Sequence, residues 1–317
     1  MPHKQDRPIR IIGAACGRGS PDPRCSEGPE ALRAAGVVER LSQSGMAAAW
    51  DETIECADPG LTPLEAVAEL CPRLADKTFS ALIDGALPLV LSGDHSCAVG
   101  IWSGISRALQ PRGNLGLLWI DAHLDSHTPE TSETGMIHGM PLAALLGYGE
   151  ASLTGCGGAG PKILAQNLCI VGVRSFESGE KRFLSELGVR IFYMEEVWRR
   201  GFAAVLQDAL LLVQADTAGF GISLDLDVID PIEAPGVGTP APRGVGADAL
   251  REALRDIGGH PDLAGIELSE YNPARDLDAK TARLAIGLLG DIFASAERTK
   301  PVEGVPGPAW PMSGSSP

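Results

Sequence analysis

Imidazole and carboxylate side chains are concentrated in residues 119–139, WIDAHLDSHTPETSETGMIHG. Three of the six histidines of the chain lie in this stretch, His123, His127 and His138, and His95 follows an apolar run upstream in LSGDHS. Carboxylates and imidazoles bind divalent cations, and an imidazole also carries protons near neutral pH. The enrichment therefore points to metal binding, to acid–base catalysis, or to both.

The spacing of the acidic residues favours a metal site. Asp121, His123 and Asp125 are two residues apart, so their side chains share one face if the strand before them stays extended, and Asp225 and Asp227 have the same spacing. Such groups would repel one another unless a multivalent cation neutralised them. Oxygen-rich ligands favour Mn²⁺ or a similar ion over structural zinc. Six ligands are too many for a single transition ion that keeps open coordination positions. We predict two ions, bridged by Asp121 and Asp225. The predicted ligands are His95, Asp121, His123, Asp125, Asp225 and Asp227.

Each motif also has an ordinary structural interpretation when it is taken alone. A single DxHxD or DxD is usually a solvated turn or a helix cap, and His138 in IHG alone would be a loop histidine. DLDVIDP lacks the glycine and the terminal glutamate of a calcium-binding EF-hand loop. The occurrence of both acidic motifs together with GDHS favours the metal site.

Apolar runs of strand length alternate with helical patterns along the chain. Strands are predicted within residues 7–16, 86–96, 114–123, 167–177, 188–197, 219–230 and 262–273. Helices are predicted within 28–41, 61–85, 97–109, 195–213 and 278–297, and residues 45–60 are predicted to be irregular. Continuous apolar strands between helices predict an α/β domain, with a mostly parallel central sheet covered by helices on both faces.

Several of the candidate residues directly follow predicted strands. In an open parallel sheet, ligands bind beyond the carboxyl ends of the strands. We therefore expect these residues to meet at one edge of the sheet. They are His95, Asp121, Asp225, Asp227 and Glu270.

The composition limits the possible partners and the location. The formal charge of −15 disfavours nucleic acid or an anionic membrane and fits a cationic substrate. No apolar run reaches the roughly 18 residues of a membrane helix, and the N-terminal residues lack the features of a signal peptide. The seven cysteines show no CxxC spacing, as expected of reduced thiols. We predict a cytoplasmic protein with a single domain at 1–298 and a flexible Pro/Gly/Ser-rich tail at 299–317, in which Trp310 is a candidate docking point.

Beyond these arguments, the motifs closely resemble those of the arginases in the ureohydrolase superfamily, which also includes agmatinases and formimidoylglutamases. The resemblance covers roughly residues 8–295. It rests on GDHS, on DAHLD with HG thirteen residues after its last aspartate, on SLDLDVIDPIEAPGVGTP and on ELSEYNP. Further matches are EGP near the N-terminus, GVRSFESGEK and HGMPLAALLGYG.

The resemblance implies a three-layer α/β/α fold with a binuclear manganese centre. One ion would be held by His95, Asp121, Asp125 and Asp225, and the other by Asp121, His123, Asp225 and Asp227. A hydroxide shared by the ions would attack the guanidinium carbon of a small cationic guanidino substrate, L-arginine or a close analogue, and release urea and an amine. The resemblance also suggests a homo-oligomer, a trimer or a hexamer.

Three residues take catalytic roles by the same resemblance. Asp125 would accept a hydrogen bond from the hydroxide, and Glu270 matches the glutamate that pairs with the guanidinium. His138 matches the proton-shuttling histidine and is the candidate donor to the leaving amine.

The substrate loop departs from the arginase pattern. Two asparagines of the family that recognise the amino-acid end of arginine are His127 and Met136 here, and a serine is Thr134. An aspartate is Glu177, whereas Glu180 and the pocket threonine, Thr239, are kept. Losing two amide contacts to a carboxylate could cost about 1.5–3 kcal/mol each, enough to change the preferred substrate. His127 could compensate with an N–H or a charge, or His127 and Met136 could merely fill space, but Met136 cannot donate a hydrogen bond.

Three alternative functions remain open from the sequence. A related ureohydrolase could act on another guanidino or formimino acid, such as a modified arginine, guanidinobutyrate or formiminoglutamate. A zinc deacetylase of similar fold would use one ion, which leaves Asp125, Asp227 and His95 unexplained. A non-enzymatic subunit of such a fold usually lacks some of the metal-ligating residues, and this sequence has all six.

Overall fold

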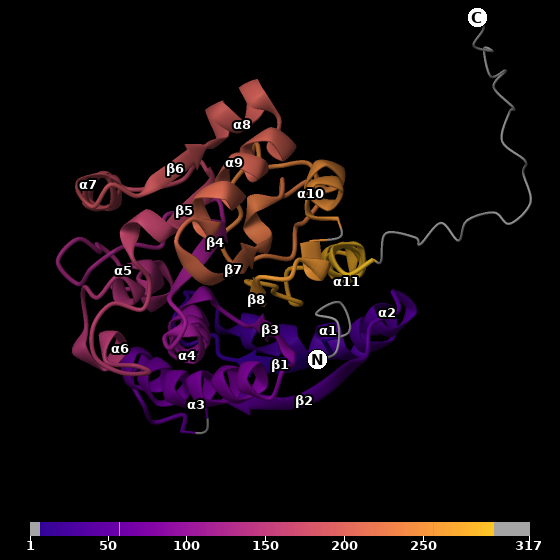
Figure 1. The fold of residues 1–317 in the computed structure, drawn as a ribbon, viewed down its shortest axis with the longest axis horizontal. Coiled ribbons are helices and arrows are strands. Elements are labelled where there is room, and N and C mark those ends of the chain that lie inside the picture. Colours follow the sequence, from indigo (N-terminus) through magenta and orange to yellow (C-terminus); the bar gives the residue numbers. More distant parts are fainter. Residues whose placement is uncertain (1–6, 57, 256, 295–317) are drawn as a thin grey trace, which may run out of the picture.

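Eight parallel strands form one central sheet in the computed structural model, which describes residues 7–56, 58–255 and 257–294 (Figure 1). Their spatial order within this part of the chain is β2-β1-β3-β8-β7-β4-β5-β6, and every pairing is parallel. The strands are β1 (Ile9–Ala15), β2 (Ala48–Glu55), β3 (Leu87–Ser92), β4 (Asn114–Ile120), β5 (Leu168–Val173), β6 (Arg190–Tyr193), β7 (Thr217–Asp225) and β8 (Leu263–Ser269). The predicted parallel α/β sheet is confirmed.

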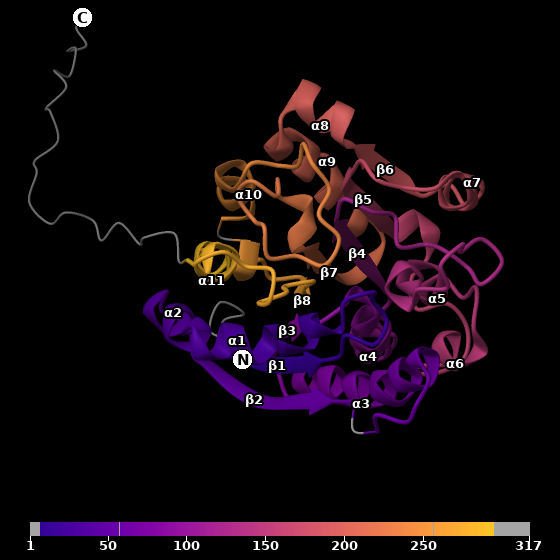
Figure 2. The same ribbon diagram turned by 180° about the vertical axis from the view of Figure 1, so that it is seen from behind.

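Helices cover both faces of this sheet, as the front and back views show (Figures 1 and 2). Side chains alternate along each strand: in β4, Leu118 and Ile120 join one apolar core, and Leu117 and Trp119 join the other. The first core includes residues of α1 (Gly28–Ala34), α2 (Val37–Gln43), α8 (Met194–Arg200), α9 (Phe202–Gln214), α10 (Ala247–Leu254) and α11 (Lys280–Ile292). The second includes residues of α3 (Pro63–Ile83), α4 (Ala98–Leu109), α5 (Pro141–Leu145), α6 (Ala151–Thr154) and α7 (Ser178–Glu186). The three-layer α/β/α architecture is therefore confirmed.

Local sequence signals account for the helix boundaries. α3 begins with a capping box, in which Thr62 and Glu65 satisfy each other's backbone N–H groups, and Pro63 occupies its first turn. Two predicted helices are each divided by a glycine with positive φ, Gly36 at 95° and Gly201 at 83°. The results are the pairs α1–α2 and α8–α9.

The prediction that residues 45–60 are irregular is wrong, because they contain the edge strand β2. β2 pairs only with β1 and is largely exposed, so it lacks the continuous apolar run that marks the central strands. The predicted tail at 299–317, with Trp310, lies outside the described residues. Within the ranges that the structure describes, no helix has both the length and the apolar character of a membrane span.

Candidate active site

The candidate residues lie at the carboxyl ends of the four central strands of the sheet, β3, β8, β7 and β4. β1 and β3 lie on one side of the sheet, and β4, β5 and β6 lie on the other side. β7 and β8, the last strands in the sequence, lie between β3 and β4. Ligand sites of open α/β sheets lie where the strand order reverses in this way. The expected convergence at one edge of the sheet is therefore observed.

The imidazole of His95 faces three carboxylates. Its Nδ1 lies 3.2 Å from Asp121 Oδ2, and 3.1 Å from Asp125 Oδ2 and from Asp225 Oδ2. All four side chains are buried, and Nδ1 makes no hydrogen bond of good geometry to any of the three oxygens. This arrangement, in which one nitrogen and three oxygens face one another without hydrogen bonds, is the one expected of ligands around a shared cation.

A second cluster adjoins the first and shares Asp121. His123 Nδ1 lies 3.0 Å from Asp227 Oδ2 and 3.6 Å from Asp121 Oδ1. The ligand atoms of Asp121, His123 and Asp227 lie within 4.8 Å of one another, as do those of His95, Asp121 and Asp225. The six predicted ligands thus form two adjacent clusters, each with the mixture of imidazole and carboxylate that suits a divalent transition ion.

The strand before Asp121 does not stay extended, so the condition under which the ligand side chains would share one face is not met. β4 ends at Ile120, and Asp125 adopts a positive φ of 43°, which turns its carboxylate back toward His95. β7 ends at Asp225, whose Oδ1 accepts a hydrogen bond from Asp227 N (2.8 Å) in the following short 3₁₀ turn. Tight turns, stabilised by the carboxylates themselves, bring the ligands together.

Electrostatic repulsion within the site supports the need for a cation. Burial, followed by the charges of Asp227 and Asp121, raises the pKa of Asp225 well above its usual range. A divalent ion would remove this penalty by compensating the clustered negative charge. The donor set therefore fits a metal, and His95 Nδ1 is the buried atom left to bind it.

A buried network behind His95 sets the orientation of its ring. His95 Nε2 lies 2.9 Å from Ser223 Oγ, and this hydroxyl donates to Glu267 Oε2 (2.7 Å). Because the hydroxyl proton goes to the carboxylate, Ser223 accepts the Nε2 proton of His95, which leaves Nδ1 unprotonated toward the carboxylates. The ring also stacks on Trp119 with centroids 4.1 Å apart, and Trp119 Nε1 donates to Asp121 Oδ2 (2.8 Å).

Strand register explains how this network assembles. Ser223 of β7 is paired with both Trp119 of β4 and Glu267 of β8, so the three side chains lie at one level of the sheet. Glu267 also accepts from Ser92 Oγ (3.0 Å) and from Trp102 Nε1 (2.9 Å). The sequence prediction missed this network, although a glutamate within the otherwise apolar run LAGIELS was a usable signal.

His138 and Glu270 form a buried pair beside the ligand clusters. His138 Nδ1 lies 3.1 Å from Glu270 Oε1, which also accepts from the backbone N–H of His95 (3.0 Å). Burial lowers the pKa of His138, but the hydrogen bond to Glu270 and the charges of Glu270, Asp125 and Asp94 outweigh it and raise that pKa to about 9.

The second oxygen of Glu270 has no hydrogen-bond partner although it is buried. Glu270 has a positive φ of 65°, an uncommon conformation that turns its carboxylate into the site. Oε2 lies close to Gly238, where a Cβ atom would approach it to 2.4 Å. An unpartnered buried carboxylate oxygen is available to a cationic group of a ligand.

An open pocket of about 310 Å³ leads from the ligand clusters to solvent. It is lined by all the predicted substrate residues: His127, Thr134, Met136, Glu177, Glu180 and Thr239. His123, Asp125, His138 and Asp225 line it as well, which joins the pocket to the clusters. Thr239 also donates to Asp227 Oδ2 (3.2 Å), so this hydroxyl orients a predicted metal ligand.

Comparison with known proteins agrees with this geometry. The model of the arginase family matches residues 7–294. The arginase of Bacillus caldovelox is 39% identical over 299 residues, covering 90% of this chain and 98% of that protein, and the arginase of Brevibacillus brevis is 37% identical, covering 90% and 97%. The crystal structure of arginase from Bacillus cereus superposes with a TM-score of 0.85 at 37% identity, covering 91% of this chain and 99% of that one. The chain belongs to the arginase family.

The arginase-family chain is thus a hydrolase of the amidinohydrolase type, as the sequence predicted. The resemblance of its motifs to the ureohydrolase superfamily is confirmed. Because a matched region of 288 residues, 7–294, takes in every strand and both clusters, the family assignment covers the whole candidate site.

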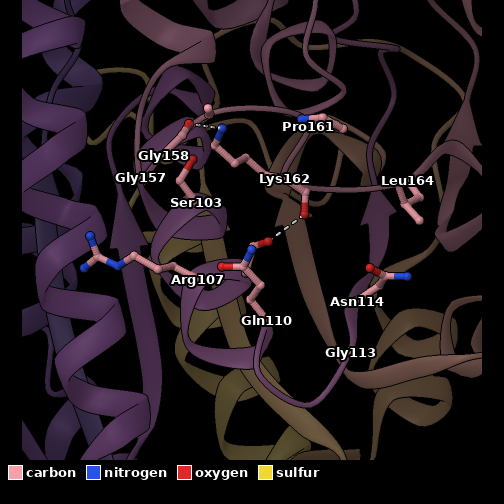
Figure 3. Close-up of a pocket in the computed structure, with 12 residues that line it drawn as sticks. Ser103, Arg107, Gln110, Gly113, Asn114, Gly157, Gly158, Pro161, Lys162 and Leu164 are labelled. Atoms are coloured by element: carbon pink, nitrogen blue, oxygen red, sulfur yellow. Dashed lines mark hydrogen bonds between the residues drawn. The ribbon is translucent and has the colours of Figure 1, made fainter.

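A second cavity of the arginase-family chain, about 220 Å³, lies near the amino end of β4 (Figure 3). The two His/Asp clusters lie at the opposite, carboxyl end of this strand. Its buried cation, Lys162, donates to the carbonyl oxygens of Thr154 (2.9 Å), Gly158 (2.7 Å) and Gly160 (2.5 Å). Arg107 is paired with Asp76 (2.9 Å). The described residues that line this cavity include no histidine, cysteine, aspartate or glutamate, so it lacks the metal-ligating groups of the candidate active site.

Proposed function

We propose that this arginase-family enzyme is a binuclear manganese amidinohydrolase that hydrolyses the guanidinium group of L-arginine or a close analogue to urea and an amine. The observation that carries the proposal is the formation of two adjacent His/Asp clusters that share Asp121, beside the pair His138–Glu270. The pocket of about 310 Å³ connects them to solvent and has room for a small guanidino compound.

One ion would be held by His95, Asp121, Asp125 and Asp225, and the other by Asp121, His123, Asp225 and Asp227. When bound, a pair of Mn²⁺ ions lowers the pKa of water and so supplies a nucleophile near neutral pH. The network Glu267–Ser223–His95 would keep Nδ1 of His95 free for the metal.

Glu270 would position the guanidinium. Its unpartnered Oε2 can accept an N–H of the planar cation, while Oε1 stays fixed by the backbone N–H of His95. A fixed carboxylate holds the guanidinium carbon in one orientation toward the metal clusters, and such positioning lowers the activation barrier.

His138 would supply a proton to the departing amine. Its pKa of about 9 means that the ring is protonated at neutral pH and has a proton to give. A new carbon–oxygen bond forms to the guanidinium carbon, one carbon–nitrogen bond breaks, and the amine leaves with the proton. Asp125, next to His95 in the first cluster, can accept a hydrogen bond from the attacking water-derived group.

A second candidate function is hydrolysis of a different guanidino or formimino acid by the same chemistry. It is favoured by His127, Met136 and Glu177, which line the pocket where the resemblance predicts two asparagines and an aspartate. The predicted homo-oligomer, the cytoplasmic location and the domain limits of 1–298 stay predictions.

A urea-release panel after loading with Mn²⁺ tests the proposal. It includes L-arginine, modified arginines, agmatine, guanidinobutyrate and formiminoglutamate, with formamide assayed for the last compound. Product release from at least one compound, with two Mn²⁺ per chain by metal analysis, is expected. The absence of any amidine hydrolysis would overturn the proposal, and one tightly bound Zn²⁺ per chain would favour the deacetylase alternative.

A further inference from the structure

The outer part of the pocket has acidic groups but few donors for a carboxylate. We infer that the enzyme selects guanidinoalkylamines, substrates that have an ammonium group and no carboxylate at the end distant from the guanidinium. This inference rests on the proposed amidine hydrolysis and specifies its substrate class. It follows from the hydrogen-bonding capacity and charge of the residues that line the pocket.

The described residues that line the pocket include no lysine and no arginine. Recognition of a carboxylate by a protein relies on cationic side chains, amide N–H groups, hydroxyls or free backbone N–H groups. Three histidines line the pocket: His123 is a predicted metal ligand, His138 pairs with Glu270, and His127 remains. Met136, at the position of the second predicted amide, has no hydrogen-bond donor in its side chain. Only the hydroxyls of Thr134 and Ser175 remain as outer side-chain donors.

Both ring nitrogens of His127 already have partners. Nε2 lies 3.0 Å from Glu177 Oε2 and 3.4 Å from Glu180 Oε2, and Nδ1 lies 3.2 Å from Thr131 Oγ1. A carboxylate from a ligand would have to displace Glu177 from Nε2 and would then lie beside the displaced carboxylate. His127 therefore does not replace the missing amide.

Four backbone N–H groups around the pocket already have side-chain acceptors. Gly135 N donates to Ser132 Oγ (2.9 Å), and Met136 N donates to Thr134 Oγ1 (3.3 Å). The neighbouring N–H groups of Ser126 and Glu177 donate to Glu180 (both 3.1 Å). These groups are unavailable to a carboxylate at the outer end of the pocket.

The acidic residues, in contrast, suit an ammonium group. The side chain of Glu177 is 64% exposed, so its carboxylate is accessible from the pocket mouth, and Glu180 lies beside it. The Glu180 side chain is only 4% exposed, and burial raises the pKa of its carboxyl to about 8. The accessible negative charge at this position is therefore that of Glu177, which attracts a cation and repels an anion. A ligand with an ammonium group and no adjacent carboxylate is attracted to the protein carboxylate, and it has no negative charge that this carboxylate would repel.

Four guanidino compounds distinguish the effect of an ammonium group from that of a carboxylate at the end distant from the guanidinium. Agmatine has the ammonium alone, L-argininamide has the ammonium with a neutral amide, L-arginine has both charges, and 4-guanidinobutyrate has the carboxylate alone. One charge-assisted hydrogen bond changes binding by roughly tenfold to a hundredfold. We expect kcat/KM for agmatine to exceed that for L-arginine at least about tenfold, with L-argininamide between them and 4-guanidinobutyrate lowest.

Variants connect the preference to named residues. Glu177→Gln should reduce the ratio of agmatine to L-arginine about tenfold, because it removes one distal charge. Glu133→Gln is the matched control, since Glu133 is an exposed residue of the same loop that does not line the pocket, and it should leave the ratio unchanged. The double variant His127→Asn/Met136→Asn restores two amides and should raise kcat/KM for L-arginine selectively.

Product binding distinguishes failure of the inference from failure of the proposed function. In calorimetric titrations of the Mn²⁺-loaded enzyme, 1,4-diaminobutane should bind more tightly than L-ornithine. Release of urea with L-arginine preferred over agmatine would overturn the inference and leave the proposed function standing. Absence of amidine hydrolysis would overturn the proposed function, and weaker binding of the diamine than of L-ornithine would then overturn the inference as well.

Discussion

Substitution of Gly238 by alanine tests whether the position of Glu270 controls the reaction. A Cβ at residue 238 would lie 2.4 Å from Glu270 Oε2 and 3.6 Å from its Cδ, so the carboxylate oxygen must move by about 1 Å to reach an ordinary contact distance. Gly238 lies outside the positive-φ region, so its backbone accepts alanine. The strain therefore falls on Glu270 and its bonds to His95 N and His138 Nδ1.

The expected loss follows from that displacement. Misplacing a positioning group by about 1 Å can reduce a rate about a hundredfold, equivalent to about 2.7 kcal/mol of transition-state stabilisation. We expect kcat/KM with the best guanidino substrate to fall by that factor, while the Mn²⁺ content and the melting temperature stay near those of the wild type. Gly246→Ala is the matched control, because a Cβ there meets only an ordinary contact of 3.6 Å with Glu233 Oε1.

A double-mutant cycle decides whether the effect passes through Glu270. In a Glu270→Gln background, Gly238→Ala should cost much less than in the wild type, because the positioned carboxylate is already lost. Full activity of Gly238→Ala would refute this account of the site. Additive losses, or loss of Mn²⁺ together with activity, would show that Gly238 acts on the metal site or the fold instead.

Three further substitutions address other parts of the site. His138→Asn should lower kcat about 10²–10⁴-fold with Mn²⁺ retained. The wild-type kcat should fall as the pH rises through about 9, because His138 then loses the proton that it donates, and the variant should lack this fall. The same fall in kcat at alkaline pH in the variant would contradict the role of His138. Ser223→Ala should weaken Mn²⁺ binding about 10–100-fold in a chelator competition, because Nε2 of His95 loses the hydroxyl that accepts its proton. Unchanged affinity would argue against control of the His95 ring by this network. Asp125→Asn should reduce the metal content to less than two ions and abolish urea release, whereas full activity would exclude Asp125 as a ligand.

Much of the fold could be predicted from local pattern. Seven strands have apolar runs that could be recognised: six are central strands buried on both faces, and the edge strand β6 still buries Ile191 and Phe192. β2 was missed, since an edge strand that is largely exposed needs no such run. The divisions at Gly36 and Gly201 were missed because a helical pattern can continue through a single glycine, and only the observed positive φ shows the break.

The sequence by itself determined the chemical type of the site. Carboxylates and imidazoles placed directly after strand runs must meet at one edge of a parallel sheet, so the meeting of His95, Asp121 and Asp225 followed from chain order. Their arrangement around the turns did not follow, because the conformation of Asp125 depends on packing and hydrogen bonds that the spacing of residues does not contain.

Tertiary structure alone decided which side chains are free to bind. Ser223 and Glu267 are 44 residues apart, and only the register between β7 and β8 makes them a proton-ordering network for His95. His127 has the same two ring nitrogens in any environment, but its contacts with Glu177 and Thr131 occupy both of them. A side chain's chemistry is set by its residue type, whereas its availability depends on neighbours that only the folded chain brings within hydrogen-bonding distance.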